Sequence, residues 1–155
     1  MEFYHEGYYL YQIADINLAT RKIGDFSKVK NKYDLVDEEC VNYNTQQIIN
    51  TKSLNNVNFK CNFNLAKKGD ILISLKQNFK PKEFNAVILN KDYVVTDKFA
   101  IITPKEKVNG KKLVKCFKDD YIISQIKPMD IGKDHFNINI KELSNILIPI
   151  KKISW

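Results

Sequence analysis

Few side chains in this sequence combine the residue types and the spacing that catalysis requires. Asp119 and Asp120 form an adjacent carboxylate pair, which could bind Mg²⁺ as in a nuclease site. The apolar segment Tyr121–Ile126 follows directly, so capping of a short helix explains the same pair more simply. Asp134 and His135 could form an acid–base pair, but neighbouring residues in a chain rarely point at one another. These residues therefore favour a structural or surface role over chemistry.

The motifs that build common cofactor and metal sites are absent from the sequence. It contains no G-x-G-x-x-G, no G-x-x-x-x-G-K-[ST] and no H-E-x-x-H, and its only histidines are His5 and His135. Five glycines spread along the chain do not form the glycine-rich turn of a methyltransferase cofactor pocket. We therefore expect no catalytic residue, no cofactor and no metal in this chain, and we interpret it as a non-enzyme.

Lysine is the binding side chain that the sequence offers in excess. Lysine and arginine number 25 against 18 acidic residues, the net charge is +7, and Arg21 is the only arginine. Lysine is a flexible point charge that suits phosphates better than bidentate reading of bases. A positive balance favours a polyanionic partner, although an AT-rich coding sequence would also enrich Lys, Asn and Ile. Charge alone therefore gives nucleic acid a modest advantage.

Length and cysteine usage limit the class of protein. The 155 residues predict one domain, with a β-rich part over about 1–105 and an α/β part over about 106–155. Cys40, Cys61 and Cys116 are scattered and odd in number, which argues against a disulfide framework and fits a reducing cytoplasm. The chain has no apolar run of membrane-spanning length, and its first residues lack the pattern of a secretory signal.

The stretch that must position any binding surface is a polar turn followed by an apolar strand. Lys67–Asp70 predicts the turn, because Gly69 can adopt φ > 0 and an aspartate readily bonds to nearby backbone. Ile71–Leu75 reads as a strand covered on both faces. The polar Lys76–Phe84 segment then predicts a loop that could present a binding surface.

The remaining segments predict an α+β fold, with strands first and short helices late. We expect a turn at Asn109-Gly110 and a polar loop over Lys127–Asn137. The expected strands are Tyr9–Ile13, Val57–Asn64, Ala86–Leu89, Tyr93–Thr96, Phe99–Thr103 and Ile146–Ile150. The expected helices are Tyr121–Ile126, capped by Asp119 or Asp120, and Ile140–Asn145, capped by Asn139.

Several of these pieces occur together in one known family. Residues 65–150 resemble the target-recognition domain of type I restriction–modification specificity subunits. The matching pieces are Leu65-x-x-x-Gly69-Asp70-Ile71-Leu72-Ile73-Ser74, Ala86–Asn90, Thr96–Pro104, Tyr121–Ile126, Gly132 and the run Phe136–Pro149. Tyr9–Ile16 matches the opening strand of the family more loosely.

The resemblance implies a fold and a division of labour. It implies a β-rich, coiled, double-β-helix-like N-terminal subdomain and a small C-terminal α/β subdomain that together read a half-site in duplex DNA. Methylation and cleavage would belong to partner subunits, so the implied partners are duplex DNA, methyltransferase subunits and a second copy or second recognition domain. Two departures stand out: no heptad-bearing helix follows Pro149, and Leu75-Lys-Gln-Asn replaces the glycine-rich loop start common in the family.

DNA recognition would use lysines for phosphates, and amides, the lone arginine and loop aromatics for base edges. The candidate DNA-binding residues are Arg21, Lys22, Lys76, Gln77, Asn78, Lys80, Lys127, Lys133, His135 and Asn137. The alternative is a protein-interaction module that binds a methyltransferase or itself. It would use exposed aromatics among Tyr4, Tyr8, Tyr9, Phe79 and Trp155. A single-stranded nucleic-acid binder ranks last, because the sequence has no RNP-like motif.

Overall fold

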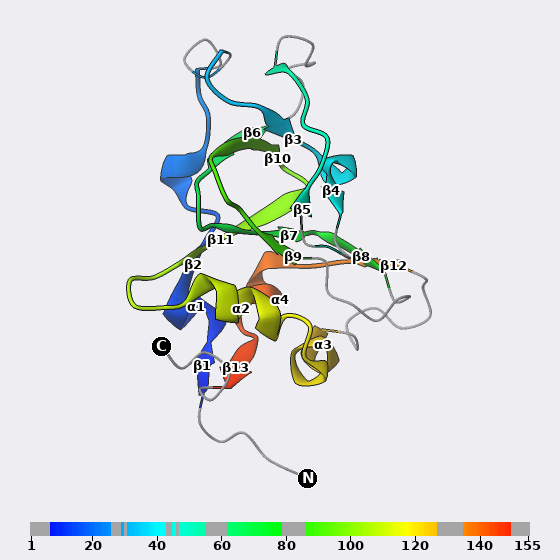
Figure 1. Ribbon diagram of the computed structural model, residues 1–155. Helices are drawn as coiled ribbons and strands as arrows, with labels where there is room; N and C mark the ends of the chain where they lie inside the picture. The colour runs from blue at the N-terminus through cyan, green and yellow to red at the C-terminus, as the bar shows by residue number, and fades with distance from the viewer. Residues whose placement is uncertain are drawn as a thin grey trace.

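Small, mostly antiparallel sheets and short helices build the α+β fold that the sequence predicts. The computed structural model describes residues 7–25, 29, 31–42, 45, 47–54, 62–78, 86–126 and 135–149. In Figure 1 most strands occupy the upper and middle parts of the molecule, and the helices lie below them together with one further pair of strands. Within the described ranges, no helix has the length and apolar character needed to cross a membrane.

A four-stranded antiparallel sheet lies at the middle of the molecule (Figure 1). Its order is β2 (Ala14–Ile16), β11 (Phe99–Pro104), β7 (Ile71–Ser74) and β9 (Ala86–Ile88). All four residues of β7 are buried, as predicted for a strand covered on both faces. The predicted strands at Ala86–Leu89 and Phe99–Thr103 are confirmed as β9 and β11.

The central sheet separates two hydrophobic cores. Ile71 and Ile73 point into the lower core, which the helices complete. Leu72, between them, points into the upper core with Val95 and Phe99. This division follows from the strand period of two, because successive side chains point to opposite faces.

The turn before β7 forms as predicted. Gly69 adopts φ +92°, a conformation that L side chains rarely adopt. The Asp70 carboxylate accepts the Lys67 backbone N–H at 2.9 Å, and the Asp70 N–H donates to the Lys67 carbonyl at 2.9 Å. The aspartate therefore closes the turn on its N-terminal side.

A second sheet lies above the first. Its order is β3 (Leu35–Val36), β10 (Tyr93–Thr96) and β6 (Phe63–Ala66), with β3 parallel to β10. Beside it, β4 (Val41–Asn42) pairs with β5 (Gln47–Ile48). The short 3₁₀ helix η1 (Ala19–Arg21) lies between β2 and β3 in the chain, and η3 (Glu38–Cys40) lies between β3 and β4. Of the strand expected at Val57–Asn64, the structure shows Phe63 and Asn64 as the start of β6, and residues 57–61 lie outside the described ranges.

Three helices follow the last long strand, and the sequence predicted two of them. For α3 (Asp120–Ile126), the Asp119 carboxylate accepts the Tyr121 N–H at 2.9 Å. For α4 (Ile140–Ser144), the Asn139 side chain accepts the Lys141 N–H at 2.8 Å. The turn expected at Asn109-Gly110 is wrong. Asn109 instead caps α2 (Gly110–Cys116), and the burial of Leu113, Val114, Cys116 and Phe117 outweighs the local turn preference.

The strand expected at Tyr9–Ile13 is also wrong. β1 (Gly7–Tyr9) ends at Tyr9, and α1 (Leu10–Ile13), a single helical turn, follows. Leu10 and Ile13 are both buried, three residues apart, so one face of a helical turn meets the core. β1 pairs with β13 (Leu147–Pro149), which confirms the extended segment predicted near the C-terminus.

Candidate nucleic-acid interface

A two-stranded ribbon joins the two segments that the sequence predicted as separate binding loops. β8 (Lys76–Asn78) pairs with β12 (His135–Asn137), with Asn137 opposite Lys76 and His135 opposite Asn78. The predicted loops are therefore shorter than expected, because their near ends are strands. Figure 1 shows this ribbon at the end of the central sheet, on the right.

The base of the ribbon is bonded to the central sheet. Leu75, between β7 and β8, donates its N–H to the Lys98 carbonyl at 3.0 Å and accepts the Ile138 N–H at 2.7 Å. Ser74 Oγ donates to the Lys76 carbonyl at 2.9 Å. The buried strand β7 therefore continues through Leu75 into the ribbon and fixes the position of the ribbon residues.

The candidate residues on the ribbon divide between surface and interior. Lys76 and Asn137 are exposed cross-strand partners, so a cation and an amide lie side by side. Gln77 is 1% exposed and donates from Nε2 to the Ser74 carbonyl at 2.6 Å. The Gln77 side chain thus supports the ribbon from within. Its expected role in base reading stays a prediction that would require this bond to break.

Arg21 is bonded to another part of the protein. Its guanidinium pairs with the Asp70 carboxylate, and their side chains are 12% and 3% exposed. It also donates to the Leu65 carbonyl at 3.4 Å. Arg21 therefore ties η1 to the turn before β7, and a DNA contact by Arg21 stays a prediction. Its neighbour Lys22 is exposed.

The other candidates lie partly or wholly outside the described residues. This applies to Lys80, Lys127 and Lys133, and to the side chains of Asn78 and His135. Among the aromatics of the alternative hypothesis, Tyr4, Phe79 and Trp155 also lie outside. Tyr9 is 44% exposed, whereas Tyr8 packs partly buried against the lower core.

The lysines of α2 were not among the predicted binding residues. Lys111, Lys115 and Lys118 are exposed along this helix and the turn after it, while Leu113, Val114 and Phe117 are buried. The signal was available as lysines at i, i+4 and i+7 on the polar side of an amphipathic segment. It was missed because the Asn-Gly pair at its start predicted a turn.

No catalytic arrangement emerges in the part of the chain that the structure describes. Across those residues, no three His, Cys, Asp or Glu side chains lie close enough to hold a metal ion. Cys40 and Cys116 are buried and do not form a disulfide. Asp119, one of the two adjacent carboxylates, is the cap of α3.

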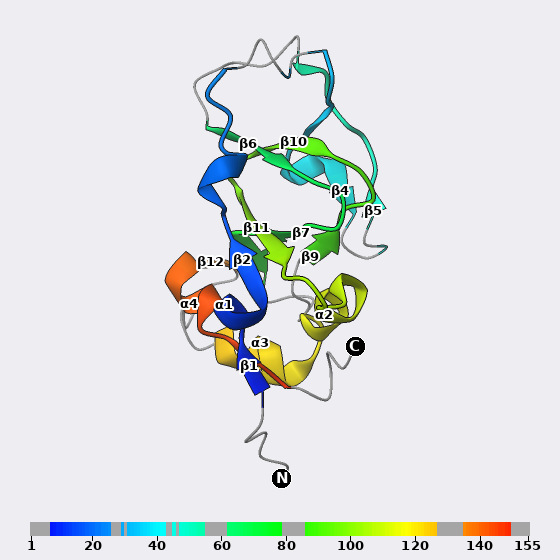
Figure 2. The same ribbon diagram turned by 90° about the vertical axis from the view of Figure 1, so that its left-hand side faces the viewer.

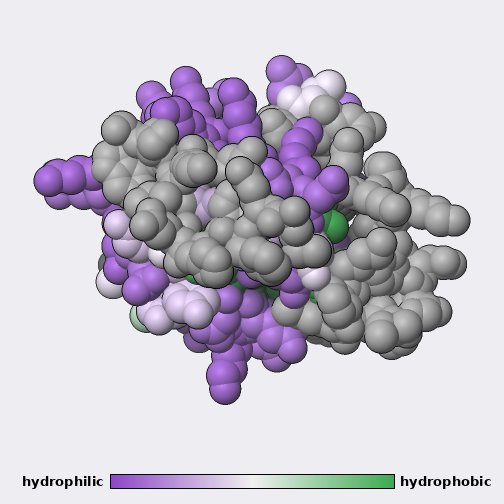
Figure 3. Space-filling view, turned by 90° about the horizontal axis from the view of Figure 1, so that it is seen from below, coloured by the Kyte–Doolittle hydropathy of each residue, from purple (hydrophilic) through white to green (hydrophobic). Residues whose placement is uncertain are grey.

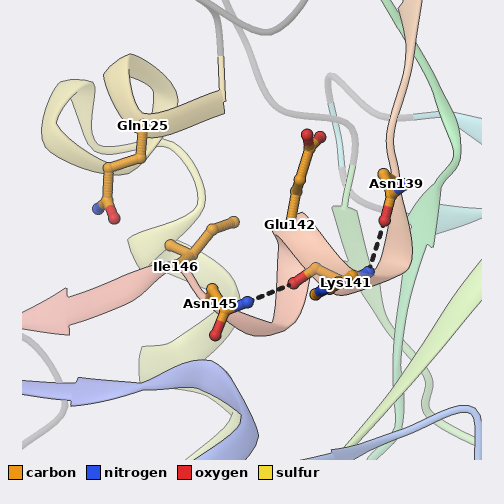
Figure 4. A pocket seen from close by; sticks show the side chains of 6 residues that line it. All are labelled: Gln125, Asn139, Lys141, Glu142, Asn145 and Ile146. Atoms are coloured by element: carbon orange, nitrogen blue, oxygen red, sulfur yellow. Dashed lines mark hydrogen bonds between the residues drawn. The ribbon is translucent and has the colours of Figure 1, made fainter.

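An open depression of about 420 Å³ beside α4 is lined by polar side chains (Figure 4). Most of its polar groups are already bonded within the protein. Gln125 bonds both the N–H and the carbonyl of Leu147, at 2.8 and 2.9 Å, and Asn145 donates to the Lys141 carbonyl at 2.9 Å. The Asn139 side chain caps α4. The lining side chains therefore serve mainly to stabilise the protein around α4, and the depression is a poor candidate for a ligand site.

Comparison with known proteins gives a match in structure but not in sequence. No family model matches the sequence, and no curated protein matches it. The crystal structure of the HsdS subunit from Thermoanaerobacter tengcongensis matches with a TM-score of 0.70 and 14% identity, over 93% of this chain and 37% of that chain.

Two further solved structures show the same likeness. A structure on complex assembly and conformational transition of the type I R-M system has a TM-score of 0.70 and 15% identity, over 92% of this chain and 36% of that chain. The type I restriction–modification S subunit from M. genitalium has a TM-score of 0.53 and 11% identity, over 92% of this chain and 33% of that chain. The chain thus spans about a third of the length of these proteins. The resemblance stated from the sequence is confirmed at the level of the fold.

Proposed function

We propose that this chain, which has the fold of part of a type I specificity subunit, recognises a short sequence in duplex DNA. In this role it acts as a half specificity subunit and carries no catalysis of its own. Methyltransferase subunits and a second recognition domain or second copy are its proposed partners. The fold supports the proposal, and the positive charge agrees with it.

The observation that carries the proposal is the β8–β12 ribbon. It brings Lys76 and Asn137, which are 61 positions apart in the sequence, next to each other on an exposed strand pair. A lysine beside an amide can bind a phosphate and an adjacent base edge together. Residues 79–85 and 127–134 adjoin the same end of this ribbon in the sequence, because Asn78 pairs with His135. These residues include the remaining candidate lysines.

A pool of duplexes with a randomised centre tests this function. The full chain is incubated with the pool, bound duplexes are recovered, and their sequences are counted over several rounds. We expect one short motif to become enriched. A bound fraction with no enriched motif would contradict sequence-specific recognition.

A matched pair of variants locates the recognition surface. Lys76→Gln with Asn137→Ala should weaken binding to the enriched motif by about tenfold or more, because one amide–base contact contributes about 1–3 kcal/mol of discrimination. Asn90→Ala with Lys91→Gln removes the same exposed residue types from another turn and should leave binding unchanged. Equal losses in both variants would place recognition elsewhere.

A second function has one specific observation in its favour. Tyr9 and Tyr11 are 44% and 50% exposed, and their rings stack with centroids 5.7 Å apart and planes 5° from parallel. Such an exposed aromatic pair suits a protein interface. For a module that binds itself, sedimentation should show a dimer that Tyr9→Ser with Tyr11→Ser dissociates. A monomer at all concentrations would rule out self-association through this pair.

A further inference from the structure

Three lysines surround an open depression on the face that carries α2. The depression has a volume of about 460 Å³ and lies between the Lys67–Asp70 turn and the start of α2. Its charged lining residues are Arg21, Lys67, Lys68, Asp70 and Lys111. The Arg21–Asp70 ion pair cancels one charge of each sign. The lining therefore keeps three positive charges.

These positive charges have no acidic partner in the described part of the chain. Neither Lys67, Lys68 nor Lys111 forms an ion pair there. The Asp92 carboxylate near the turn accepts the backbone N–H of Lys68 at 2.8 Å.

Lysines at the upper end of the molecule are arranged differently. Lys98 lies 3.6 Å from Glu38, Lys91 lies 4.0 Å from Asp34, and Lys52 pairs with Glu39. These carboxylates, Asp34, Asp37, Glu38 and Glu39, here called the acidic cluster, therefore neutralise the lysines at the upper end and leave the lysines around the depression uncompensated.

The positive surface continues from the depression along α2. Lys111, Lys115 and Lys118 follow at helical spacing and are all exposed. At 1.5 Å per residue, Lys111 and Lys115 lie roughly 6 Å apart along the axis of α2, and Lys118 follows in the turn after the helix. Each strand of duplex DNA has one phosphate per about 3.4 Å of axis, so these lysines can meet more than one phosphate.

One lysine on α2 is placed where it weakens the helix. Lys111 lies in the first turn, which carries no acidic residue, although the helix dipole favours negative charge there, whereas Lys115 lies in the last turn, where the dipole favours a cation. Lys111 and Lys115 also repel each other as like charges at i and i+4. A bound polyanion would reverse both effects.

We propose that Lys67, Lys68, Lys111, Lys115 and Lys118, here called the lysine surface, bind the phosphodiester backbone of duplex DNA irrespective of its sequence. The proposal rests on the proposed function and adds a second contact area to it. Lysine suits phosphates, and the surface has no free arginine for bidentate base reading. Figures 1 and 2 place α2 and the β8–β12 ribbon on different sides of the molecule, so mutation can separate the two surfaces.

Binding of the full chain to a labelled duplex of arbitrary sequence, measured by fluorescence anisotropy between 50 and 300 mM KCl, tests the lysine surface. The slope of log affinity against log salt changes by about 0.9 for each lost phosphate contact. Lys67→Gln with Lys68→Gln, and Lys111→Gln with Lys115→Gln, should each reduce the slope by up to about 1.8. Lys91→Gln with Lys98→Gln removes the same charge from lysines near the acidic cluster and should leave the slope unchanged.

The outcomes separate this proposal from the proposed function. An equal slope change in all three double variants would overturn the lysine surface, since it would report net charge alone. Binding of poly-glutamate as tight as that of duplex, with the same losses in the variants, would overturn it in favour of an acidic protein. An enriched motif together with unchanged slopes would overturn the lysine surface while the proposed function stands. Reduced slopes without an enriched motif would support the surface and contradict sequence-specific recognition.

Discussion

At the scale of single residues, the Arg21–Asp70 ion pair is the clearest determinant of stability. Both side chains are largely buried, and Asp70 also closes the turn before β7. Removing one partner of a buried pair leaves the other charge unpaired, which costs about 3–5 kcal/mol. Arg21→Met should therefore lower the free energy of unfolding by about 3 kcal/mol in urea denaturation.

The exposed neighbour of Arg21 supplies the control for this experiment. Lys22→Met removes a positive charge one residue away and should change the free energy of unfolding by less than about 0.5 kcal/mol. Comparable losses in the two variants would show that the ion pair contributes little. The lone arginine would then become available for DNA.

Tyr93 makes the stability of the folded protein depend on pH in the alkaline range. Burial, and secondly the charge of Asp34, raise the pKa of Tyr93 above its usual value. As pH rises above about 10, the unfolded chain loses this proton first, so unfolding is favoured. Urea denaturation at about pH 9 and about pH 11 should show a larger loss of stability for the wild type than for Tyr93→Phe. Parallel losses would mean that lysine deprotonation dominates.

Single residues also show how far sequence reasoning reached. Asp119 and Asn139 were predicted as caps because a cap and its helix are adjacent in sequence. The partner of Arg21 could not be predicted, because Asp70 is 49 positions away and only the fold brings the two together. The burial of Gln77 could not be predicted either, because it is set by the fold, and in the sequence Gln77 resembles a loop amide.

At the scale of elements, the pairing of β1 with β13 depends on a missing side chain. A Cβ atom at Gly7 would lie 2.6 Å from the Ile148 carbonyl oxygen, closer than real contacts allow. Gly7→Ala should therefore push the two strands apart and lower the free energy of unfolding by about 1–3 kcal/mol. Thermal or urea denaturation measures this change.

Gly24 provides the matched control, because a Cβ there would meet no atom within 4 Å among the described residues. Gly24→Ala should leave stability within about 0.5 kcal/mol of the wild type. If Gly7→Ala were equally harmless, the β1–β13 pair would have to adjust more easily than this close approach allows.

Elements with strong local patterns were predicted, and elements set by distant contacts were not. The turn at Lys67–Asp70, strand β7 and helices α3 and α4 follow from nearby residues alone. The helical turn α1 was not predicted, because its residues favour strands locally. Contacts set by the fold form it: Leu10 and Ile13 are buried together, and the Leu10 N–H donates to the Ile146 carbonyl at 2.9 Å. The β8–β12 pairing escaped because strand register over such a separation leaves no local pattern.

At the scale of the whole molecule, one sheet serves two cores. The lower core joins residues from both ends of the described chain, such as Leu10 and Ile148, with the helices. The upper core belongs to the strands around β10. Seen from below in Figure 3, the described residues of the helical end present mainly hydrophilic side chains. The lower core therefore holds the first and last described strands of the chain against the central sheet. The described surface at the lower end of the molecule is mostly polar.

The register of the ribbon has a consequence for changing what the protein recognises. Because Asn78 pairs with His135, the segment 79–85 begins and the segment 127–134 ends at the same pair of residues. The ribbon that carries this pair is anchored through Leu75 to the buried strand β7. Both segments can therefore be exchanged together, as a single cassette, with the Asn78–His135 pair kept as their shared boundary. Engineering a new specificity would then be a matter of replacing two short segments rather than redesigning a domain.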